Sequence, residues 1–468
     1  MCGIAGFIGK GTERDLKAMI QSISYRGPDH QGTFLGDGVG LAHARLSIID
    51  LSPEAHQPFF SQDHSIAITF NGEIYNFIEL RETLLRTGRY AFRTRSDTEV
   101  LIYLYEEYGT AMLGLLNGMF AFGIWDFRKR RLLMARDRMG KKPLFYAQVG
   151  DNLIFASELK AIQHHPLVSS EVNLEALNEY LTFEYVPTPH SIIQGIQKLE
   201  PGCYFLWEKG GIVEKKPFYR IDFHPTESDA KTAASRLDDL LDDSVKLRMV
   251  SDVPLGVFLS GGLDSSLVAY YAQKNSMQKI KTFSIGFSEK SYDESDYASA
   301  VARHLGTEHH SKILSATDTL DLLEGLYQRL DEPFADASLI PTHLLSCFAR
   351  QQVTVALGGD GSDELLAGYP TFLSDRVSGP FVAMPRFVLR SIRKLARFLP
   401  VSDENISLDF KIKQFLRGFE MERKHVFTLW LGAFLPSEKQ KLLSPDTLAD
   451  LRGAHGLEII DQWLDELP

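Results

Sequence analysis

Residues 253–266 have the sequence VPLGVFLSGGLDSS, and this stretch constrains the fold more than any other part of the chain. Residues 257–259 form a short apolar run, as in a buried parallel strand. Residues 260–262 (SGG) then let the backbone turn tightly, and apolar residues recur at helical spacing over residues 267–271. A strand, a glycine loop and a helix in this order predict a phosphate site, because free N–H groups at the helix start face an anion and the helix dipole favours it.

Asp264 lies at the start of the predicted helix. Its carboxylate would repel phosphate unless a divalent cation lay between them, which favours Mg²⁺. The stretch is not a Walker A loop, because it lacks the lysine that reaches the β- and γ-phosphates. A tight turn capped by Ser260 or Asp264 is the alternative, and the complete SGGLDSS string argues against it. That string resembles the PP-loop of ATP pyrophosphatases, which cleave ATP between its α- and β-phosphates and adenylate an oxygen of the substrate.

Length, charge and cysteine content restrict the class of protein. A chain of 468 residues is longer than one that folds around a single hydrophobic core, so we expect two or more domains. The net charge is -11, without a long basic run, which argues against a nucleic-acid partner. Three widely spaced cysteines form neither a disulfide framework nor a zinc pattern, as is typical of a reducing cytosol. Because no apolar run could span a bilayer and no secretory signal is present, we expect a cytoplasmic protein without a membrane partner.

Cys2 directly follows Met1. Removal of Met1 would leave Cys2 with both a thiol and a free α-amino group. An α-amino group has a pKa of about 7.7–8.0, so it can act as the base of a terminal nucleophile. The alternative is a buried cysteine on a first strand.

Two further stretches carry candidate binding groups. Residues 43–50 have the β-branched content of a strand, and Arg45 within them could pair bidentately with a carboxylate or form a surface ion pair. Residues 66–70 alternate as one strand face and lead into Asn71 and Gly72. An Asn-Gly pair predicts a hairpin turn, and it could also present an amide and a backbone N–H to an oxyanion.

Residues 96–99 (SDTE) predict a helix N-terminus with a capping box. Asp97 then either favours the helix dipole or holds a substrate ammonium group. Five short motifs therefore occur in order: MCGI at 1–4, RGPD at 26–29, RLSI at 45–48, NGE at 71–73 and SD at 96–97. Together they resemble a class II glutamine amidotransferase domain, and more closely the one in glutamine-hydrolysing asparagine synthetases.

This resemblance implies a role for each matching residue. Cys2 attacks the side-chain amide of glutamine, and Asn71 with the Gly72 N–H forms the oxyanion hole. The glutamine-binding set is Arg45 for the carboxylate, Glu73 and Asp97 for the α-amino group, and Asn71 and Gly72. The products are glutamate and ammonia.

From about residue 230 the pattern changes to alternating helices and strands, which predicts a parallel α/β sheet. Residues 282–287 (TFSIGF) and 353–357 (VTVAL) are predicted strands. The second strand leads into GGDGSDE at 358–364, a glycine-rich loop with three acidic residues. Because their carboxylates repel one another, the loop favours a bound cation or a basic ligand.

The GGDGSDE loop resembles the second ATP motif of the same family. The resemblance implies that Asp363 joins Asp264 in binding Mg²⁺, and that Asp360 occupies the position of an acid important for forming a β-aspartyl-adenylate. The implied ATP-binding set is Leu259, Ser260, Gly261, Gly262, Asp264, Ser265, Ser266, Ile285, Gly358 and Gly359. Leu259 and Ile285 are also candidates for ordinary core positions.

The predicted fold is an α+β N-terminal nucleophile glutaminase domain, an αββα sandwich, over residues 2–216. An α/β PP-loop domain, like those of adenine nucleotide α hydrolases, follows over residues 235–468. The family's second domain normally continues into a longer helical portion, so we expect this one to be truncated at its C-terminus.

The predicted activity is ATP-dependent asparagine synthesis with glutamine as amide donor, with ATP and Mg²⁺ as cofactors. Glutamine, aspartate and ATP are the predicted substrates, and a homodimer is a possible assembly. Two alternatives stay open: a glutaminase whose synthetase domain is impaired by truncation, and an amidotransferase for another carboxylate acceptor.

Overall fold

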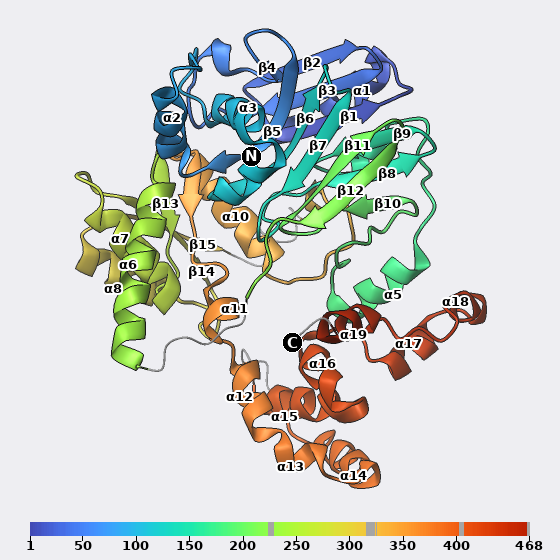
Figure 1. The fold of residues 1–468 in the computed structure, drawn as a ribbon. Helices are drawn as coiled ribbons and strands as arrows, with labels where there is room; N and C mark the ends of the chain where they lie inside the picture. Colours follow the sequence, from blue (N-terminus) through green and yellow to red (C-terminus); the bar gives the residue numbers. More distant parts are fainter. Residues whose placement is uncertain (223–228, 315–322, 324, 402–406, 466–468) are drawn as a thin grey trace. The chain divides into compact units, whose positions relative to one another are not determined.

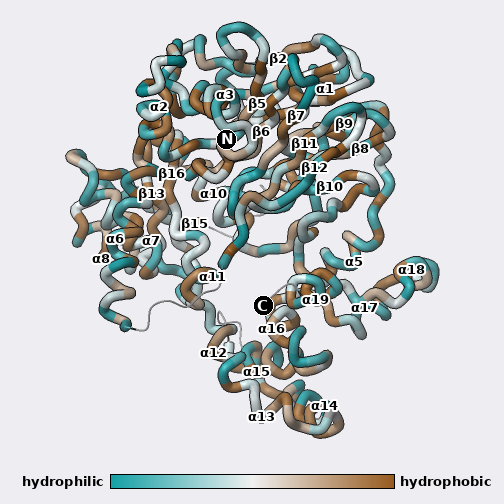
Figure 2. The backbone as a smooth tube through the Cα atoms, viewed as in Figure 1, coloured by the Kyte–Doolittle hydropathy of each residue, from teal (hydrophilic) through white to brown (hydrophobic). Residues whose placement is uncertain are grey.

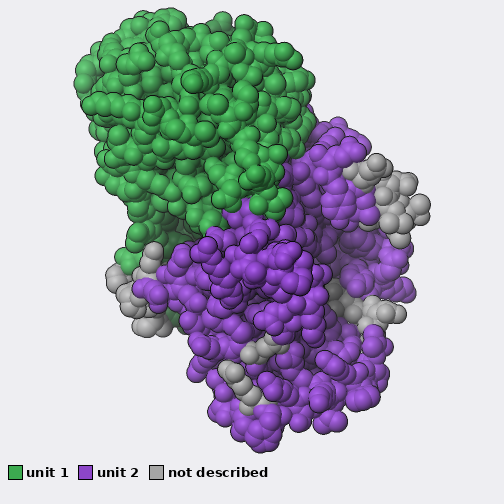
Figure 3. Space-filling model, turned by 90° about the vertical axis from the view of Figure 1, so that its right-hand side faces the viewer, with its two compact units in different colours: residues 1–172, 188–254 green, residues 173–187, 255–468 purple. Residues whose placement is uncertain are grey.

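The computed structural model describes residues 1–222, 229–314, 323, 325–401 and 407–465 (Figure 1). Within these ranges no helix combines the length and the apolar character needed to cross a membrane. Figure 2 shows hydrophilic and hydrophobic residues mixed along helices such as α6 (Ala230–Arg248) and α14 (Arg386–Ala396). The chain forms two compact units (Figure 3). Unit 1 comprises residues 1–172 and 188–254, and unit 2 comprises residues 173–187 and 255–468.

Unit 1 contains two six-stranded antiparallel sheets. The first has the order β10-β8-β9-β1-β3-β2, and its strands are β1 (Gly3–Ile8), β2 (His30–Gly36), β3 (Val39–Arg45), β8 (Phe145–Val149), β9 (Asn152–Ala156) and β10 (Ile196–Lys198). The second has the order β12-β11-β7-β6-β5-β4, and its strands are β4 (Phe59–Phe60), β5 (Ile66–Ile74), β6 (Gly118–Asp126), β7 (Arg131–Arg136), β11 (Cys203–Glu208) and β12 (Gly211–Pro217).

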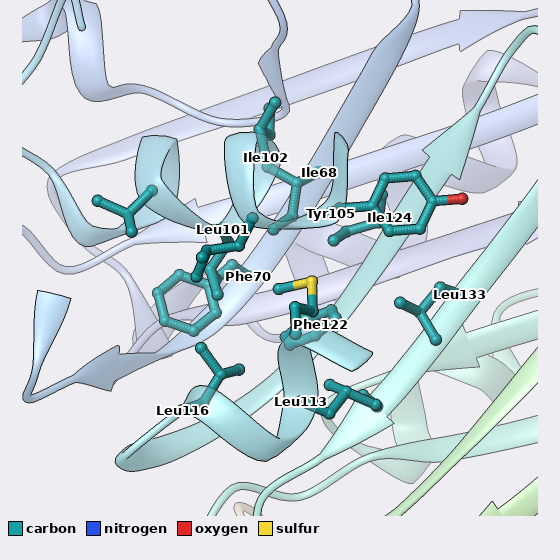
Figure 4. Close-up of a cluster of buried hydrophobic side chains, with 14 of the residues drawn as sticks. Ile68, Phe70, Leu101, Ile102, Tyr105, Leu113, Leu116, Phe122, Ile124 and Leu133 are labelled. Atoms are coloured by element: carbon teal, nitrogen blue, oxygen red, sulfur yellow. The ribbon is translucent and has the colours of Figure 1, made fainter. Parts of the chain in front are cut away.

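Helices cover the outer faces of these sheets. A shared core between the sheets joins Ile4 and Leu41 of the first to Ala121 and Met134 of the second. On the outside of the first sheet pack α1 (Glu13–Ser22) and α4 (Leu159–Gln163). On the outside of the second packs α3 (Asp97–Tyr108), preceded by α2 (Phe77–Arg86); Figure 4 shows part of this cluster. Strands β1 and β3 are buried throughout, because both faces of their sheet are covered. The predicted αββα sandwich is confirmed.

Unit 2 is built around a four-stranded parallel sheet with the order β15-β14-β13-β16. The strands are β13 (Leu255–Phe258), β14 (Lys281–Phe287), β15 (Glu308–Leu314) and β16 (Val355–Leu357), and helices α7 (Leu263–Lys274), α8 (Ser295–Leu305) and α10 (Leu339–Arg350) pack around them. The chain moves from β13 to β14 and β15 on one side, and β16 pairs on the other side of β13. The strand order therefore reverses between β13 and β16, and such a switch point is where open α/β sheets bind ligands. The predicted parallel α/β sheet is confirmed.

Short helices make up the rest of unit 2: α5 (Leu174–Phe183), α11 (Ser362–Leu366), α12 (Pro370–Val377), α13 (Gly379–Val382), α14, α15 (Leu408–Arg417), α16 (Val426–Leu431), α17 (Pro436–Leu442), α18 (Pro445–Asp450) and α19 (Glu458–Asp465). A buried lysine joins α5 to α17. Lys439 Nζ donates to Asn178 Oδ1 at 2.7 Å and to Thr182 Oγ1 at 2.7 Å. This contact explains why residues 173–187 belong to unit 2 although the flanking chain belongs to unit 1.

Three local expectations need correction. Strand β3 ends at Arg45, so the strand predicted over 43–50 is too long. Asn71 and Gly72 lie within β5, not in a turn, because the chain continues in register with β6. Ser96 caps α3 as predicted, but no capping box closes, because the Glu99 carboxylate instead accepts the backbone N–H groups of residues 93 and 94.

Candidate active sites

Cys2 directly precedes β1, an interior strand of the first sheet of unit 1, and lies next to the end of β3. Gly3 pairs with Ala44, which brings the Cys2 sulfur to Leu46; Sγ accepts the Leu46 N–H at 3.4 Å and lies 3.5 Å from Leu46 O. Arg26 Nε donates to Cys2 O at 2.9 Å, and its guanidinium pairs with Glu158 at 2.6 Å. The backbone of the predicted nucleophile is therefore fixed on two sides.

Burial dominates the electrostatics of this sulfur. Burial raises the pKa of the Cys2 thiol, and the charge of Asp97 also raises it. The hydrogen bond with Leu46 and the positive charges of the amino terminus and Arg45 act in the opposite direction. A thiol of this kind stays neutral until a base removes its proton. Because the charges of Arg45 and Asp97 both act on the Cys2 thiol, the three side chains lie close enough to interact electrostatically.

Arg45 is the last residue of β3 and is 4% exposed. Its guanidinium donates to two backbone carbonyls, Ser52 O at 2.9 Å and Asp50 O. No carboxylate lies within ion-pair distance of it in the described part of the chain. The surface ion pair considered from the sequence is therefore ruled out, and a buried cation held by neutral groups is suited to an anionic ligand.

Asn71 and Gly72 present unused hydrogen-bonding groups from β5. Asn71 is 1% exposed, and neither atom of its side-chain amide has a hydrogen-bond partner among the described residues. Leaving such a group unsatisfied costs about 1–3 kcal/mol, so it calls for a ligand partner. A Cβ at Gly72 would lie 2.3 Å from Met119 O, so the neighbouring strand permits only glycine there.

Alternation along β5 gives the direction of the Gly72 N–H. The N–H of Phe70 donates to Gln57 Oε1 at 2.7 Å, and the N–H of Ile74 donates to Asp97 Oδ2 at 3.0 Å. Both point to the strand edge that faces away from β6. Because every second N–H in a strand points the same way, the Gly72 N–H between them points to that edge as well.

Two buried carboxylates complete this site. Burial raises the pKa of Glu73 to about 7; the Asp97 charge raises it further, and the Lys142 and Arg248 charges oppose the shift. Burial also raises the pKa of Asp97 to about 6, against hydrogen bonds from Ile74 and Ser96 that lower it. Two carboxylates in low dielectric repel each other, and an ammonium ligand would relieve that repulsion.

The second candidate site follows β13. Gly261 has φ +86°, and a Cβ there would lie 2.6 Å from the Ala298 N, so the tight turn requires glycine. Ser265 Oγ closes the loop by accepting the Ser260 N–H at 3.2 Å, and the Ser266 hydroxyl is buried without a recorded partner within the described ranges. Gly262 is the N-cap of α7, so free N–H groups at this helix start face the loop.

The GGDGSDE loop meets this helix start. It follows β16, which pairs directly with β13, and a Cβ at Gly359 would lie 2.9 Å from Ser265 N and 3.0 Å from Asp264 Cβ. The two loops therefore pack backbone to backbone at the switch point. Partial burial raises the pKa of Asp264, and the nearby charges of Asp363 and Glu364 raise it further.

The remaining predicted residues lie around these two loops. Leu259 is 1% exposed and donates its N–H to Phe283 O at 2.9 Å, while Ile285 is half-buried on β14, beside β13. The Asp360 carboxylate is exposed and folds back over Gly358, where a Cβ would lie 2.7 Å from Oδ2. Leu259 thus belongs to the core, as its alternative reading allowed.

Comparison with known proteins also divides the chain into an N-terminal and a C-terminal part, each of which matches a family model. Residues 1–219 match the model of a glutamine amidotransferase domain, and residues 236–452 match the model of asparagine synthase. A putative glutamine-hydrolysing asparagine synthetase of Methanocaldococcus jannaschii is 37% identical over 428 residues, covering 86% of this chain and 80% of that protein. The chain belongs to the glutamine-hydrolysing asparagine synthetase family.

Other relatives of the chain differ in name and in the share of their length that this chain covers. Asparagine synthetase 1 of Bacillus subtilis is 38% identical over 410 residues, and this chain spans 64% of its length. A Penicillium rubens protein named amidase chyE is 30% identical over 453 residues, with 65% of its length covered. Relatives of this chain thus carry more than one named activity.

The structure also fits the Mg²⁺ expected for ATP chemistry in this family. Asp264 and Asp363 are close enough to interact electrostatically. No cluster of three or more His, Cys, Asp or Glu side chains suited to a metal occurs within the described ranges. Two carboxylates suffice for Mg²⁺, because it is commonly held by one or two carboxylates together with substrate phosphates.

Two buried groups near Cys2 were not identified from the sequence. Lys142 is 4% exposed, its Nζ lies 3.0 Å from Met1 Sδ, and burial lowers its pKa to about 8. His43 is fully buried, burial lowers its pKa to about 3, and its Nε2 donates to Phe70 O at 3.0 Å. Lys142 lies in the basic stretch RDRMGKKPLFY at 136–146, and His43 begins the 43–50 stretch that carries Arg45.

Proposed function

We propose that this protein is a glutamine-dependent asparagine synthase, which makes asparagine from aspartate with ammonia released from glutamine. ATP is converted to AMP and pyrophosphate through a β-aspartyl-AMP intermediate, and glutamate is the second product. The proposal is carried by the buried polar groups near Cys2: two neighbouring carboxylates and, as far as the structure describes the chain, a guanidinium without a carboxylate partner and an amide without hydrogen-bond partners. An α-amino acid with a side-chain amide offers a complementary group to each of them.

The first half-reaction takes place at Cys2. After removal of Met1, the free α-amino group of Cys2 accepts the thiol proton, and Sγ attacks the amide carbon of glutamine. Asn71 Nδ2 and the Gly72 N–H donate to the resulting oxyanion. The proton passes to the leaving nitrogen, ammonia departs, and water hydrolyses the thioester to glutamate.

Three charged side chains orient the glutamine in this proposal. Arg45 binds its α-carboxylate, while Glu73 and Asp97 bind its α-ammonium group. Each of the three is at least nine-tenths buried, so each interaction is formed in a low dielectric and selects for a zwitterionic amino acid over a simple amide.

The second half-reaction takes place between the two loops of unit 2. The residues proposed to bind ATP are Leu259, Ser260, Gly261, Gly262, Asp264, Ser265, Ser266, Ile285, Gly358 and Gly359. Asp264 and Asp363 would hold Mg²⁺, which when bound neutralises phosphate charge. Asp360 takes part in forming the adenylate from the aspartate β-carboxylate and ATP. Ammonia then attacks the β-carbonyl carbon and AMP leaves.

Two other functions are compatible with the same residues. A glutaminase without synthetase activity would follow if groups needed for adenylation are missing from this chain. Transfer to another carboxylate is favoured by one specific observation, the 30% identity to a relative named an amidase.

One assay separates these possibilities. The purified chain is incubated with glutamine, ATP, Mg²⁺ and aspartate, and glutamate, pyrophosphate and asparagine are measured together. Asparagine in equal amount to pyrophosphate supports the proposal, and glutamate without pyrophosphate supports the glutaminase. Pyrophosphate formed with a different acid, but not with aspartate, supports another acceptor. The Cys2→Ala variant should lose glutamate formation by at least a thousandfold and should keep pyrophosphate release when ammonia replaces glutamine.

A further inference from the structure

The loop after β3 sets the direction of the Arg45 guanidinium. Arg45 donates to the carbonyl oxygens of Asp50 and Ser52, which both belong to this loop. Asp50 itself has φ +55°, in the left-handed region, and its Oδ1 accepts the Ser52 hydroxyl at 2.6 Å. Because these backbone carbonyls orient the Arg45 guanidinium, its direction depends on the contacts that hold Asp50 in place.

Two segments distant in sequence fix Asp50. The Arg95 N–H donates to Asp50 Oδ2 at 2.7 Å. The Asp50 N–H donates to Asp252 Oδ2 at 2.8 Å, and the Asp252 N–H donates to Ile48 O at 3.0 Å. Asp252 therefore holds the loop at two points, with its side chain and with its backbone.

The segment that carries Asp252 belongs to unit 1 and packs against the rest of that unit. Val250 and Ile49 both pack against the apolar cluster formed by α3 and β5. The guanidinium carbon of Arg248 lies 4.3 Å from the centre of the Tyr75 ring, two residues after Glu73. Residues 248–252 thus contact both the Arg45 loop and the strand end beside Glu73.

We infer that Asp252 is a positioning residue of the glutaminase site, which holds the Arg45 loop so that the guanidinium meets the α-carboxylate of glutamine. Asp252 lies outside residues 1–219, which match the amidotransferase model, and within residues 236–452, which match asparagine synthase. The glutamine-binding site of unit 1 is therefore completed by the chain that leads into β13, which begins three residues after Asp252. This inference rests on the proposed function.

The test compares Asp252→Ala with Asp252→Asn in the full chain. An asparagine carbonyl can still accept the Asp50 N–H, so this variant should restore near wild-type behaviour. In a glutaminase assay, the alanine variant should raise KM for glutamine about threefold to tenfold, the value of one such hydrogen bond, with kcat within about twofold. Asp239→Ala, at an exposed position on α6, is the matched control and should change neither constant.

A second substrate separates positioning from general damage to the fold. The amide of 4-aminobutanoic acid lacks the α-carboxylate, so its kcat/KM should be the same in wild type and Asp252→Ala. An unchanged KM for glutamine in the alanine variant, or an equal loss with both substrates, would refute the role of Asp252 and leave the proposed function intact. A wild-type chain that forms no glutamate from glutamine would instead refute the proposed function and this inference together.

Discussion

Replacing Asn71 with leucine should make the protein more stable and far less active. Both atoms of the Asn71 amide are buried without a hydrogen-bond partner among the described residues, so folding removes them from water without a compensating hydrogen bond. Leucine has a similar volume and no polar atoms to desolvate. With about 1–3 kcal/mol for unsatisfied polar atoms and about 1 kcal/mol for imperfect repacking, we expect the free energy of unfolding to rise by up to about 2 kcal/mol. Loss of an oxyanion-hole donor should lower kcat about 10²–10³-fold.

Thermal unfolding and glutaminase assays on the same samples test this. For a unit of this size, 1 kcal/mol corresponds to about 2–4 °C in Tm. Asn152→Leu is the matched control, because the Asn152 amide is satisfied: its Oδ1 accepts the Lys10 N–H at 2.7 Å and its Nδ2 donates to Val149 O at 2.9 Å. That variant should lose stability, because it leaves both partners unpaired.

Two outcomes would refute the reasoning. If Asn71→Leu loses as much stability as Asn152→Leu, the Asn71 amide has a partner in the folded protein and is not reserved for a ligand. If the variant gains stability but keeps its kcat, the unpartnered amide does not serve as the oxyanion donor.

The other predictions concern Glu73 and Gly359. Because the pKa of Glu73 is raised to about 7, kcat/KM for glutamine should increase with pH through about 7, as its carboxylate forms. Since the folded protein binds this proton more tightly than the unfolded chain, stability should decline between about pH 4.5 and 7, and Glu73→Gln should flatten that decline in urea titrations. Gly359→Ala places a Cβ 2.9 Å from Ser265 N, so it should raise KM for ATP at least tenfold while glutamate formation stays within about twofold. Equal losses in both assays would contradict the assignment of Gly359 to the nucleotide site.

Local patterns predicted much of the fold. The apolar run at 257–259 and the glycines after it predicted the strand, turn and helix that the structure contains as β13 and α7. Strand β14 was predicted within one residue of its start. These elements follow from backbone preference and side-chain periodicity, which act within a few residues and are therefore visible in sequence.

The Asn-Gly pair shows where local preference fails. It favours a two-residue turn, yet Asn71 and Gly72 continue β5, because pairing with β6 along nine positions outweighs the preference of one dipeptide. The glycine is required for a different reason, the approach of Met119 O from the neighbouring strand. Glu99 likewise was assigned to a capping box and instead accepts N–H groups from the segment before α3.

The sequence by itself determined the chemical inventory: a cysteine after the first methionine, an ordered set of amidotransferase motifs and two glycine-rich loops with acids. The tertiary structure decided which side chains lack hydrogen-bond or ion-pair partners among the described residues, and which distant side chains lie close together. Burial excluded the alternative of a surface ion pair for Arg45, Lys142 came to lie near Cys2, and Asp252 holds Asp50 across some 200 residues of sequence. Burial and hydrogen-bond satisfaction depend on contacts between distant segments, and no local pattern encodes them.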